Sequence, residues 1–308
     1  MISFQEAKGI FDLPFFNLIY KAHSIHRENF DPNKIQLSSL LSLQTGGCSE
    51  DCAYCAQSIR NKTKLPKQAI TDMDTILDAA KKVKEIGGTR LCMGASGRKP
   101  TCEFFNLICE AIKEVKKLGI EACVTMGTLT EEQVKILKEC GLDYYNHNID
   151  TSPEHYNNII TTRSIEERIA TINLVQESGI NICSGGILGI GESNDDRIKM
   201  LLLLANLSTP PKSVPINKLV KIPGTPLENA PDVDNFDFIR TIALARILMP
   251  KSYIKLSAGR ESMSKESQTL CFFAGANSIF IGEKLLTTKN VNYQEDMELL
   301  EKLNLSII

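Results

Sequence analysis

Three cysteines stand close together in the stretch GGCSEDCAYCAQS, residues 46–58. Cys48, Cys52 and Cys55 are separated by three residues and then by two. Thiolates are ligands for soft metals such as zinc and iron. Three of them do not close a tetrahedral zinc site, and no histidine or fourth cysteine follows at ligand spacing, so a structural zinc site is the weaker alternative. A 4Fe–4S cluster on these residues would keep one iron without a protein ligand, and that open position could bind a small molecule.

Polar and sulfur side chains also interrupt several runs that are otherwise apolar. They are Cys92, Cys123, Asn146, Asn148, Cys183, Asn217 and Lys255. A buried polar group is costly unless it is paired or coordinated. Because these residues are spread over most of the apolar runs, we predict that they meet at one shared central site.

The apolar runs themselves are typical of β-strands. Eight candidates, rich in β-branched and apolar residues, lie at 37–43, 89–93, 121–126, 143–149, 181–188, 213–220, 252–257 and 277–282. Helical segments alternate with them, and parallel strands need such crossover helices. Eight units over about 250 residues predict a (β/α)₈ TIM-type barrel. A doubly wound open sheet is the second choice, since it would more often show an early G-x-G-x-x-G turn.

Polar caps and glycines mark the ends of the predicted helices. We expect one helix to begin at Thr71 and another near Cys102, and both to end at a glycine (Gly87 and Gly119). Thr130 with Gln133, and Ser164 with Glu167, have the spacing of capping boxes. The segments 4–29 and 292–305 read as helical additions outside the repeat. No linker divides the sequence, so we predict a single domain, residues 1–308, with the barrel core at about 36–290.

Composition excludes several classes of function. The formal net charge of −2 argues against nucleic acid or an acidic membrane surface as a partner. The N-terminal segment does not resemble a signal peptide and no apolar stretch is long enough to span a bilayer, so we expect a cytoplasmic protein. Disulfides are improbable there, which favours a metal or redox role for some of the ten cysteines. For Cys102, Cys109, Cys140 and Cys271 we expect only the role of small apolar residues.

Two motifs together resemble the radical S-adenosylmethionine superfamily. One is the C-x₃-C-x₂-C spacing after the first predicted strand, with Tyr54 before the last cysteine. The other is GGILGIGES, in which Gly185, Ile187, Gly189 and Glu192 fit the pattern G-x-I-x-G-x-x-E of the fifth strand. The resemblance implies that S-adenosylmethionine chelates the open iron and that its reductive cleavage yields a 5′-deoxyadenosyl radical. The alternative reading of the second motif is an ordinary glycine-rich strand-to-helix turn.

Further motifs resemble the biotin synthase family, from about residue 25 to residue 290. They include TRLCMGAS, LDYYNHNIDTSPEHYNNIITTR, SVPINKLVK and LSAGRE. This resemblance implies sulfur insertion into dethiobiotin to give biotin, with a second, sacrificial 2Fe–2S cluster as the sulfur donor. It also implies a flavodoxin-type reductant, iron–sulfur assembly proteins and a homodimer.

The resemblance assigns roles to individual residues. Cys48, Cys52 and Cys55 match the ligands of the 4Fe–4S cluster, and Cys92, Cys123 and Cys183 match those of the 2Fe–2S cluster. Residues expected to contact S-adenosylmethionine are Asn148, Asp150, Arg168, Gly185, Ile187, Gly189 and Glu192. Residues expected near dethiobiotin are Asn146, Asn217, Thr287 and Thr288. For any single Asn or Thr, a hydrogen bond at a turn or strand end is the plainer reading.

The sequence departs from the family pattern at two places. Lys255 stands where the family has an arginine that binds the inner cluster, and the two residue types are not interchangeable. The stretch SGRKPTCEFF follows CMGA, where the family usually has a tryptophan, and this chain has none. Three other functions stay open at this point. They are a different radical enzyme, an iron–sulfur electron carrier and a structural zinc protein.

Overall fold

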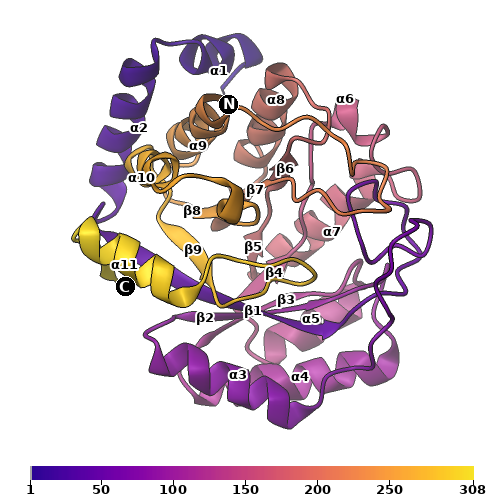
Figure 1. The fold of residues 1–308 in the computed structure, drawn as a ribbon. Helices are drawn as coiled ribbons and strands as arrows, with labels where there is room; N and C mark the ends of the chain where they lie inside the picture. The colour runs from indigo at the N-terminus through magenta and orange to yellow at the C-terminus, as the bar shows by residue number, and fades with distance from the viewer. Residues whose placement is uncertain (1) are drawn as a thin grey trace.

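The computed structural model describes residues 2–308, and its centre is a closed barrel of parallel strands (Figure 1). The strands run in the order β1-β2-β3-β4-β5-β7-β8-β9, and β1 pairs with β9 to complete the circle. Every pair in the barrel is parallel. The predicted (β/α)₈ barrel is therefore confirmed. The strands are β1 Lys34–Gln44, β2 Arg90–Ala95, β3 Glu121–Thr125, β4 Tyr144–Asn146, β5 Asn181–Cys183, β6 Gly186–Leu188, β7 Ser213–Lys218, β8 Tyr253–Leu256, β9 Ser278–Ile281 and β10 Ser306–Ile307.

The predicted fifth strand is interrupted. It divides into β5 and β6, and Gly185 lies between them. A Cβ atom added to Gly185 would lie 1.9 Å from the carbonyl oxygen of Pro215 in β7. The two backbones therefore approach more closely than any other residue type would permit, and the ladder breaks at this point.

Helices cover the outside of the barrel. They are α1 Phe4–Phe11, α2 Phe15–Asn29, α3 Met73–Glu85, α4 Cys102–Lys117, α5 Glu131–Glu139, α6 Pro153–Tyr156, α7 Ile165–Glu177, α8 Asn194–Ala205, α9 Asn235–Leu248, α10 Lys265–Phe273 and α11 Tyr293–Lys302, with a 3₁₀ turn at Arg260–Ser262. In Figure 1, α3 and α4 lie on one side of the barrel, and α2 packs on α9 on another. None of these helices, within residues 2–308, is both long and apolar enough to cross a membrane.

The capping signals in the sequence are largely confirmed. Thr130 with Gln133 and Ser164 with Glu167 form complete capping boxes at the starts of α5 and α7. The start of α3 was wrong by one residue, because Asp72, and not Thr71, accepts the N–H of Thr75. The short strand β10, which pairs in parallel with Lys34 and Ile35 at the start of β1, was not predicted.

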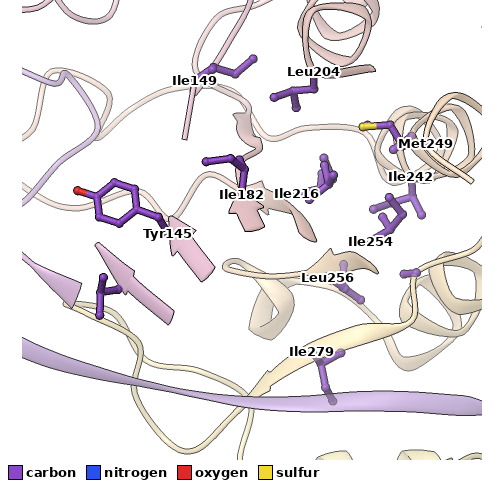
Figure 2. Packing of buried hydrophobic residues seen from close by; sticks show 14 of the residues in the cluster. Tyr145, Ile149, Ile182, Leu204, Ile216, Ile242, Met249, Ile254, Leu256 and Ile279 are labelled. Atoms are coloured by element: carbon purple, nitrogen blue, oxygen red, sulfur yellow. The ribbon is translucent and has the colours of Figure 1, made fainter. Parts of the chain in front are cut away.

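Successive side chains along the strands face alternately toward the surrounding helices and toward the barrel interior. Ile182, Ile216, Ile254, Leu256 and Ile279 point outward into the layer between strands and helices, where Figure 2 shows Ile254 beside Ile242 of α9. The alternate residues face the barrel interior. Cys92, Cys123, Tyr144, Cys183 and Phe280 form a separate buried cluster there. The strands thus deliver their sulfur side chains to the inside and their aliphatic side chains to the helices.

Candidate active site

A cavity of about 350 Å³ opens at the carboxyl ends of the barrel strands, and both groups of cysteines line it. Cys48, Cys52 and Cys55, the outer triad, lie in the loop after β1 and are partly exposed. Cys92, Cys123 and Cys183, the inner triad, are buried on β2, β3 and β5. The sequence analysis predicted a shared central site for the polar and sulfur residues of the strands, and the position of the inner triad is consistent with that prediction.

The outer triad lies in a loop that is held both by its own hydrogen bonds and by bonds to a distant segment. Ala53 donates its N–H to the carbonyl of Ile159 at 3.0 Å, and Asp51 accepts hydrogen bonds from Thr161 and Thr162. Burial would raise the pKa of Asp51, but these hydrogen bonds lower it to about 2. Within the loop, Asn61 donates to the carbonyls of Cys52 and Cys55 at 3.0 and 2.8 Å. These bonds fix the backbone that presents the three thiols.

The inner triad is set by strand register. Cys92 and Cys123 are direct partners across β2 and β3, and Asn146 is the partner of Cys183 across β4 and β5. The neighbouring thiol of Cys123, opposed by burial and assisted by Lys255, lowers the pKa of Cys183, while the pKa of Cys123 itself is raised. The amide of Asn146 also donates to the sulfur of Cys183 at 3.4 Å.

Two buried cations lie close to the inner triad. Lys255 is fully buried and donates to Ser38 Oγ at 2.9 Å, with its ammonium 4.1 Å from the centre of the Phe280 ring. Burial, assisted by Arg90, lowers the pKa of Lys255, and the three neighbouring thiols oppose this shift only in part. Arg90 pairs with Glu121 at 2.8 Å, yet its Nη1 has no hydrogen-bond partner among residues 2–308. Positive charge is thus concentrated where several thiolates would need compensation.

Arg168 forms the polar side of the cavity mouth. Its Nε donates to the Tyr156 hydroxyl at 2.5 Å, its Nη1 to the carbonyl of Asn148 at 2.7 Å, and its Nη2 pairs with Asp150 at 2.8 Å. Asp150 also accepts the Tyr54 hydroxyl at 2.9 Å. Asp150 lines the cavity and has a positive φ of 67°, which is uncommon for a residue other than glycine.

The predicted contact residues divide into two groups. Asn146, Asn148, Asp150, Arg168, Ile187, Asn217, Thr287 and Thr288 all line the cavity. Glu192 lies outside it, where its carboxylate accepts the N–H groups of Gly189 and Ile190 and pairs with Arg197 at 2.7 Å. Gly185 and Gly189 also lie outside the lining, and Gly185 shapes the wall by its close approach to β7. Asn148 lies two residues beyond β4, and not within the strand as predicted.

The other cysteines behave mostly as expected. Cys109, Cys140 and Cys271 are buried outside the cavity. Cys102 is exposed at the start of α4 and also lies outside the cavity lining. Sequence reasoning missed Glu50, Arg163 and Lys218, which also line the cavity. A charged residue inside a cysteine motif was the only available signal, and it applied to Glu50 alone.

The donor set of the cavity suits iron–sulfur chemistry. Six thiols in two triads, with cations beside the inner one, match the soft, negatively charged character of such clusters. No group of His, Cys, Asp or Glu within residues 2–308 is arranged to hold a single metal ion.

Solved structures with low sequence identity share the fold. Methylornithine synthase superimposes with a TM-score of 0.84 at 19% identity, covering 100% of this chain and 94% of that one. The FeFe-hydrogenase maturase HydG from Carboxydothermus hydrogenoformans gives 0.82 at 20% identity, covering 99% and 76%. At this identity the likeness establishes only the common barrel.

Sequence comparisons identify the family. The model of the radical SAM superfamily matches residues 43–205, and that of the biotin and thiamin synthesis associated domain matches residues 215–306. A biotin synthase of Rickettsia felis is 58% identical over 303 residues, 98% of each chain. One from Lawsonia intracellularis is 56% identical, over 98% of this chain and 96% of that one. The chain therefore belongs to the biotin synthase family, within the radical SAM superfamily.

Proposed function

We propose that this chain inserts sulfur into dethiobiotin to form biotin. The observation that carries the proposal is the single cavity lined by both cysteine triads. An enzyme that joins a radical reaction to a sulfur transfer needs both groups within reach of one substrate. Family membership at 58% identity supports the same reaction.

We assign the outer triad to a 4Fe–4S cluster with S-adenosylmethionine and the inner triad to a 2Fe–2S cluster. When bound, these groups supply a radical able to remove hydrogen from unactivated carbon and a source of sulfur. The partial exposure of the outer triad suits a site that must receive an electron and exchange a cosubstrate. The buried inner triad suits a sulfur source that is kept from solvent.

Arg168, Asp150 and Asn148 would bind S-adenosylmethionine. A carboxylate and an amide suit ribose hydroxyls, and a guanidinium suits the methionyl carboxylate. Because Arg168 already bonds Asp150 and the carbonyl of Asn148, the three groups are placed before any ligand arrives. Such preorganisation lowers the entropic cost of binding.

Asn146 and Asn217 would bind the ureido ring of dethiobiotin. Protein bonds hold both amides in place: Asn146 accepts from Thr125 at 2.9 Å, and Asn217 accepts from the N–H of Ala258 at 3.2 Å and donates to Gly186 at 2.9 Å. Thr287 and Thr288, in the turn closed by the bond from Leu285 N–H to Thr288 at 2.9 Å, would receive the carboxylate tail. The apolar lining residues Leu40, Phe280 and Leu285 would keep water from the reacting carbon.

The remaining assignments rest on the family resemblance. They are a flavodoxin-type reductant, iron–sulfur assembly proteins, a homodimer and a cytoplasmic location. A single domain is supported by the pairing of β1 with β9, since one continuous barrel includes strands from both ends of the chain.

An anaerobic single-turnover assay tests the proposal. Reconstituted protein would be given reductant, S-adenosylmethionine and dethiobiotin, and both 5′-deoxyadenosine and biotin would be quantified. We expect both products, with deoxyadenosine formation dependent on dethiobiotin. Deoxyadenosine without biotin would overturn the assignment of the inner triad or of the substrate. Neither product, from protein with full iron and sulfide, would overturn the function.

A further inference from the structure

Arg98 connects the outer cysteine loop to the helix that bears Arg168. It lies in the loop after β2, in the stretch SGRKPT that departs from the family pattern. Its Nη1 donates to Glu50 Oε1 at 3.3 Å, and its Nη2 donates to Glu167 Oε1 at 2.5 Å. One guanidinium therefore links two carboxylates that are more than a hundred residues apart in sequence.

The Glu50 end of this bridge is buried inside the cysteine loop. Glu50 stands between Cys48 and Cys52 and is 6% exposed. Its carboxylate also accepts the Thr162 hydroxyl at 2.8 Å and lies 3.5 Å from Arg163. A buried carboxylate depends on such partners, and losing one leaves the charge poorly compensated. The position of the loop is thus coupled to the position of Arg98.

The Glu167 end adjoins the proposed S-adenosylmethionine site. Glu167 is in the first turn of α7 and directly precedes Arg168. Its second oxygen accepts the N–H of Ser164 at 2.9 Å, which fixes the start of the helix. A shift of Glu167 would therefore move Arg168 together with the groups that Arg168 binds.

The main chain of Arg98 is also tightly held, unlike that of most surface ion pairs. Its carbonyl accepts the N–H and the hydroxyl of Thr128 at 2.8 and 3.0 Å and Arg163 Nη2 at 3.2 Å. A Cβ atom on Gly127 would lie only 2.1 Å from this carbonyl oxygen. Because the backbone is anchored, the side chain spans a fixed distance. Isolated ion pairs on a protein surface, in contrast, contribute little to stability.

We propose that Arg98 is a positioning residue for S-adenosylmethionine binding, which sets the separation between the outer cysteine loop and Arg168. The inference rests on the proposed function, since it assumes that the cosubstrate binds between these two elements. It adds a residue from the divergent loop to the set that the family pattern assigns.

The test uses reconstituted holoenzyme and compares Arg98→Ala, Arg98→Lys and the wild type. The affinity for S-adenosylmethionine would be read from the change that it causes in the electron paramagnetic resonance spectrum of the reduced 4Fe–4S cluster. KM and kcat for deoxyadenosine formation would be measured in parallel. For Arg98→Ala we expect Kd and KM to rise about tenfold, the scale seen when an outer-shell partner of a metal site is lost, with kcat little changed. Arg98→Lys should rescue binding only in part, because an ammonium cannot bridge two carboxylates as a guanidinium does.

The matched control is Lys99→Ala, which removes an exposed cation from the same loop and should bind S-adenosylmethionine like the wild type. Glu167→Gln is a second variant, since it retains an acceptor for Ser164 and weakens only the bond to Arg98. We expect it to weaken binding, and the double variant with Arg98→Ala to be no weaker than Arg98→Ala alone.

The outcomes separate the inference from the function beneath it. If Arg98→Ala binds S-adenosylmethionine with an unchanged Kd, the inference is overturned and the proposed function stays intact. If Arg98→Ala does not load its clusters, an unchanged Kd in Glu167→Gln overturns the inference in the same way. A fall in kcat at unchanged KM also overturns it. A wild type whose cluster spectrum does not respond to S-adenosylmethionine overturns the proposed function itself.

Discussion

Tyr54 donates its hydroxyl to the carboxylate of Asp150 across 2.9 Å, and this bond joins the outer cysteine loop to the segment after β4. Asp150 pairs on its other side with Arg168 at 2.8 Å. Asp150 is also one of only two non-glycine residues with positive φ within residues 2–308. Its two partners offset a backbone conformation that such residues rarely adopt.

Replacing Tyr54 with Phe should weaken S-adenosylmethionine binding. The variant keeps the partly buried ring but removes one hydrogen-bond donor to the Asp150 carboxylate, so we expect KM for S-adenosylmethionine to rise about tenfold. Steady-state assays of deoxyadenosine formation would measure it. Tyr20→Phe, at an exposed position on α2, is the control. Equal KM values for the two variants would show that the bond has no part in binding.

Alanine substitutions in the two triads should have separable effects. Cys52→Ala should lose the 4Fe–4S cluster and with it all deoxyadenosine formation. Cys183→Ala should lose the 2Fe–2S cluster and biotin formation, yet keep uncoupled cleavage of S-adenosylmethionine. Iron and sulfide analysis with Mössbauer spectroscopy would follow each cluster. Loss of both clusters in Cys183→Ala, in protein that is still folded, would contradict two independent sites.

Lys255→Met should weaken retention of the inner cluster. The change keeps an unbranched chain of similar length but removes a buried cation beside three thiols. We expect the 2Fe–2S absorption to decay about tenfold faster under a chelator, while the 4Fe–4S signal is unaffected. Lys255→Arg retains a cation and should therefore hold the cluster longer than Lys255→Met does. Lys251→Met, at an exposed position, is the control. An unchanged decay rate in Lys255→Met would exclude this role for the charge.

Two glycine substitutions should have opposite effects on stability. Gly185→Ala would place a methyl group 1.9 Å from the Pro215 carbonyl oxygen, so we expect a loss of at least about 3 kcal/mol. Gly9→Ala should gain about 0.5–1 kcal/mol, because Gly9 is inside α1 and an added Cβ there meets no atom of residues 2–308 within 4 Å. Urea unfolding monitored by circular dichroism would measure both. A tolerated Gly185→Ala would mean that β5 and β7 can separate at small cost.

His26 should make the protein sensitive to acid. Burial, with the nearby Arg246, lowers its pKa from 6.5 to about 3, and neither ring nitrogen has a hydrogen-bond partner among residues 2–308. A histidine whose folded pKa is depressed binds its proton preferentially in the unfolded chain. The stability that depends on neutral His26 is therefore complete above pH 6.5, and it is lost as the pH falls toward 3. Between pH 7 and pH 5 this loss is about 2 kcal/mol.

The variant His26→Leu removes that titration. We expect its free energy of unfolding to fall less than that of the wild type between pH 7 and pH 5. His23→Leu, on the same helix at a partly exposed position, controls for the loss of an imidazole. If the free energy of unfolding changes with pH in the same way in the wild type and in His26→Leu, protonation of His26 does not destabilise the folded state.

Local signals in the sequence were enough to predict the barrel fold. The capping boxes at Thr130 and Ser164 depend on residues three apart, and strand alternation is a two-residue period, so a single sequence contains both. The break between β5 and β6 was not predictable in this way. It depends on how closely Gly185 meets Pro215, and no local pattern records that distance.

In the candidate site, too, local patterns predicted some residues, and contacts between distant segments determine others. The cysteine spacing and the polar residues on the strands predicted the cavity lining, because parallel strands bring their carboxyl ends together. Arg98 and Arg163 were missed, since each looks like a surface cation until the fold places it against Glu50. Glu192 stays a predicted ligand contact from its motif, and in the structure its carboxylate accepts the N–H of Gly189 in its own turn.

The bonds of the outer cysteine loop also determine when that loop can form during synthesis. Its main anchors, from Asp51 to Thr161 and Thr162 and from Tyr54 to Asp150, span 110, 111 and 96 residues. At 5–20 residues per second, a ribosome needs on the order of 5–20 s to add the later partners. Until then the loop has only its local bonds, such as those from Asn61 to the carbonyls of Cys52 and Cys55. The outer triad therefore reaches its final position against the barrel only after the chain has been synthesised as far as Thr162.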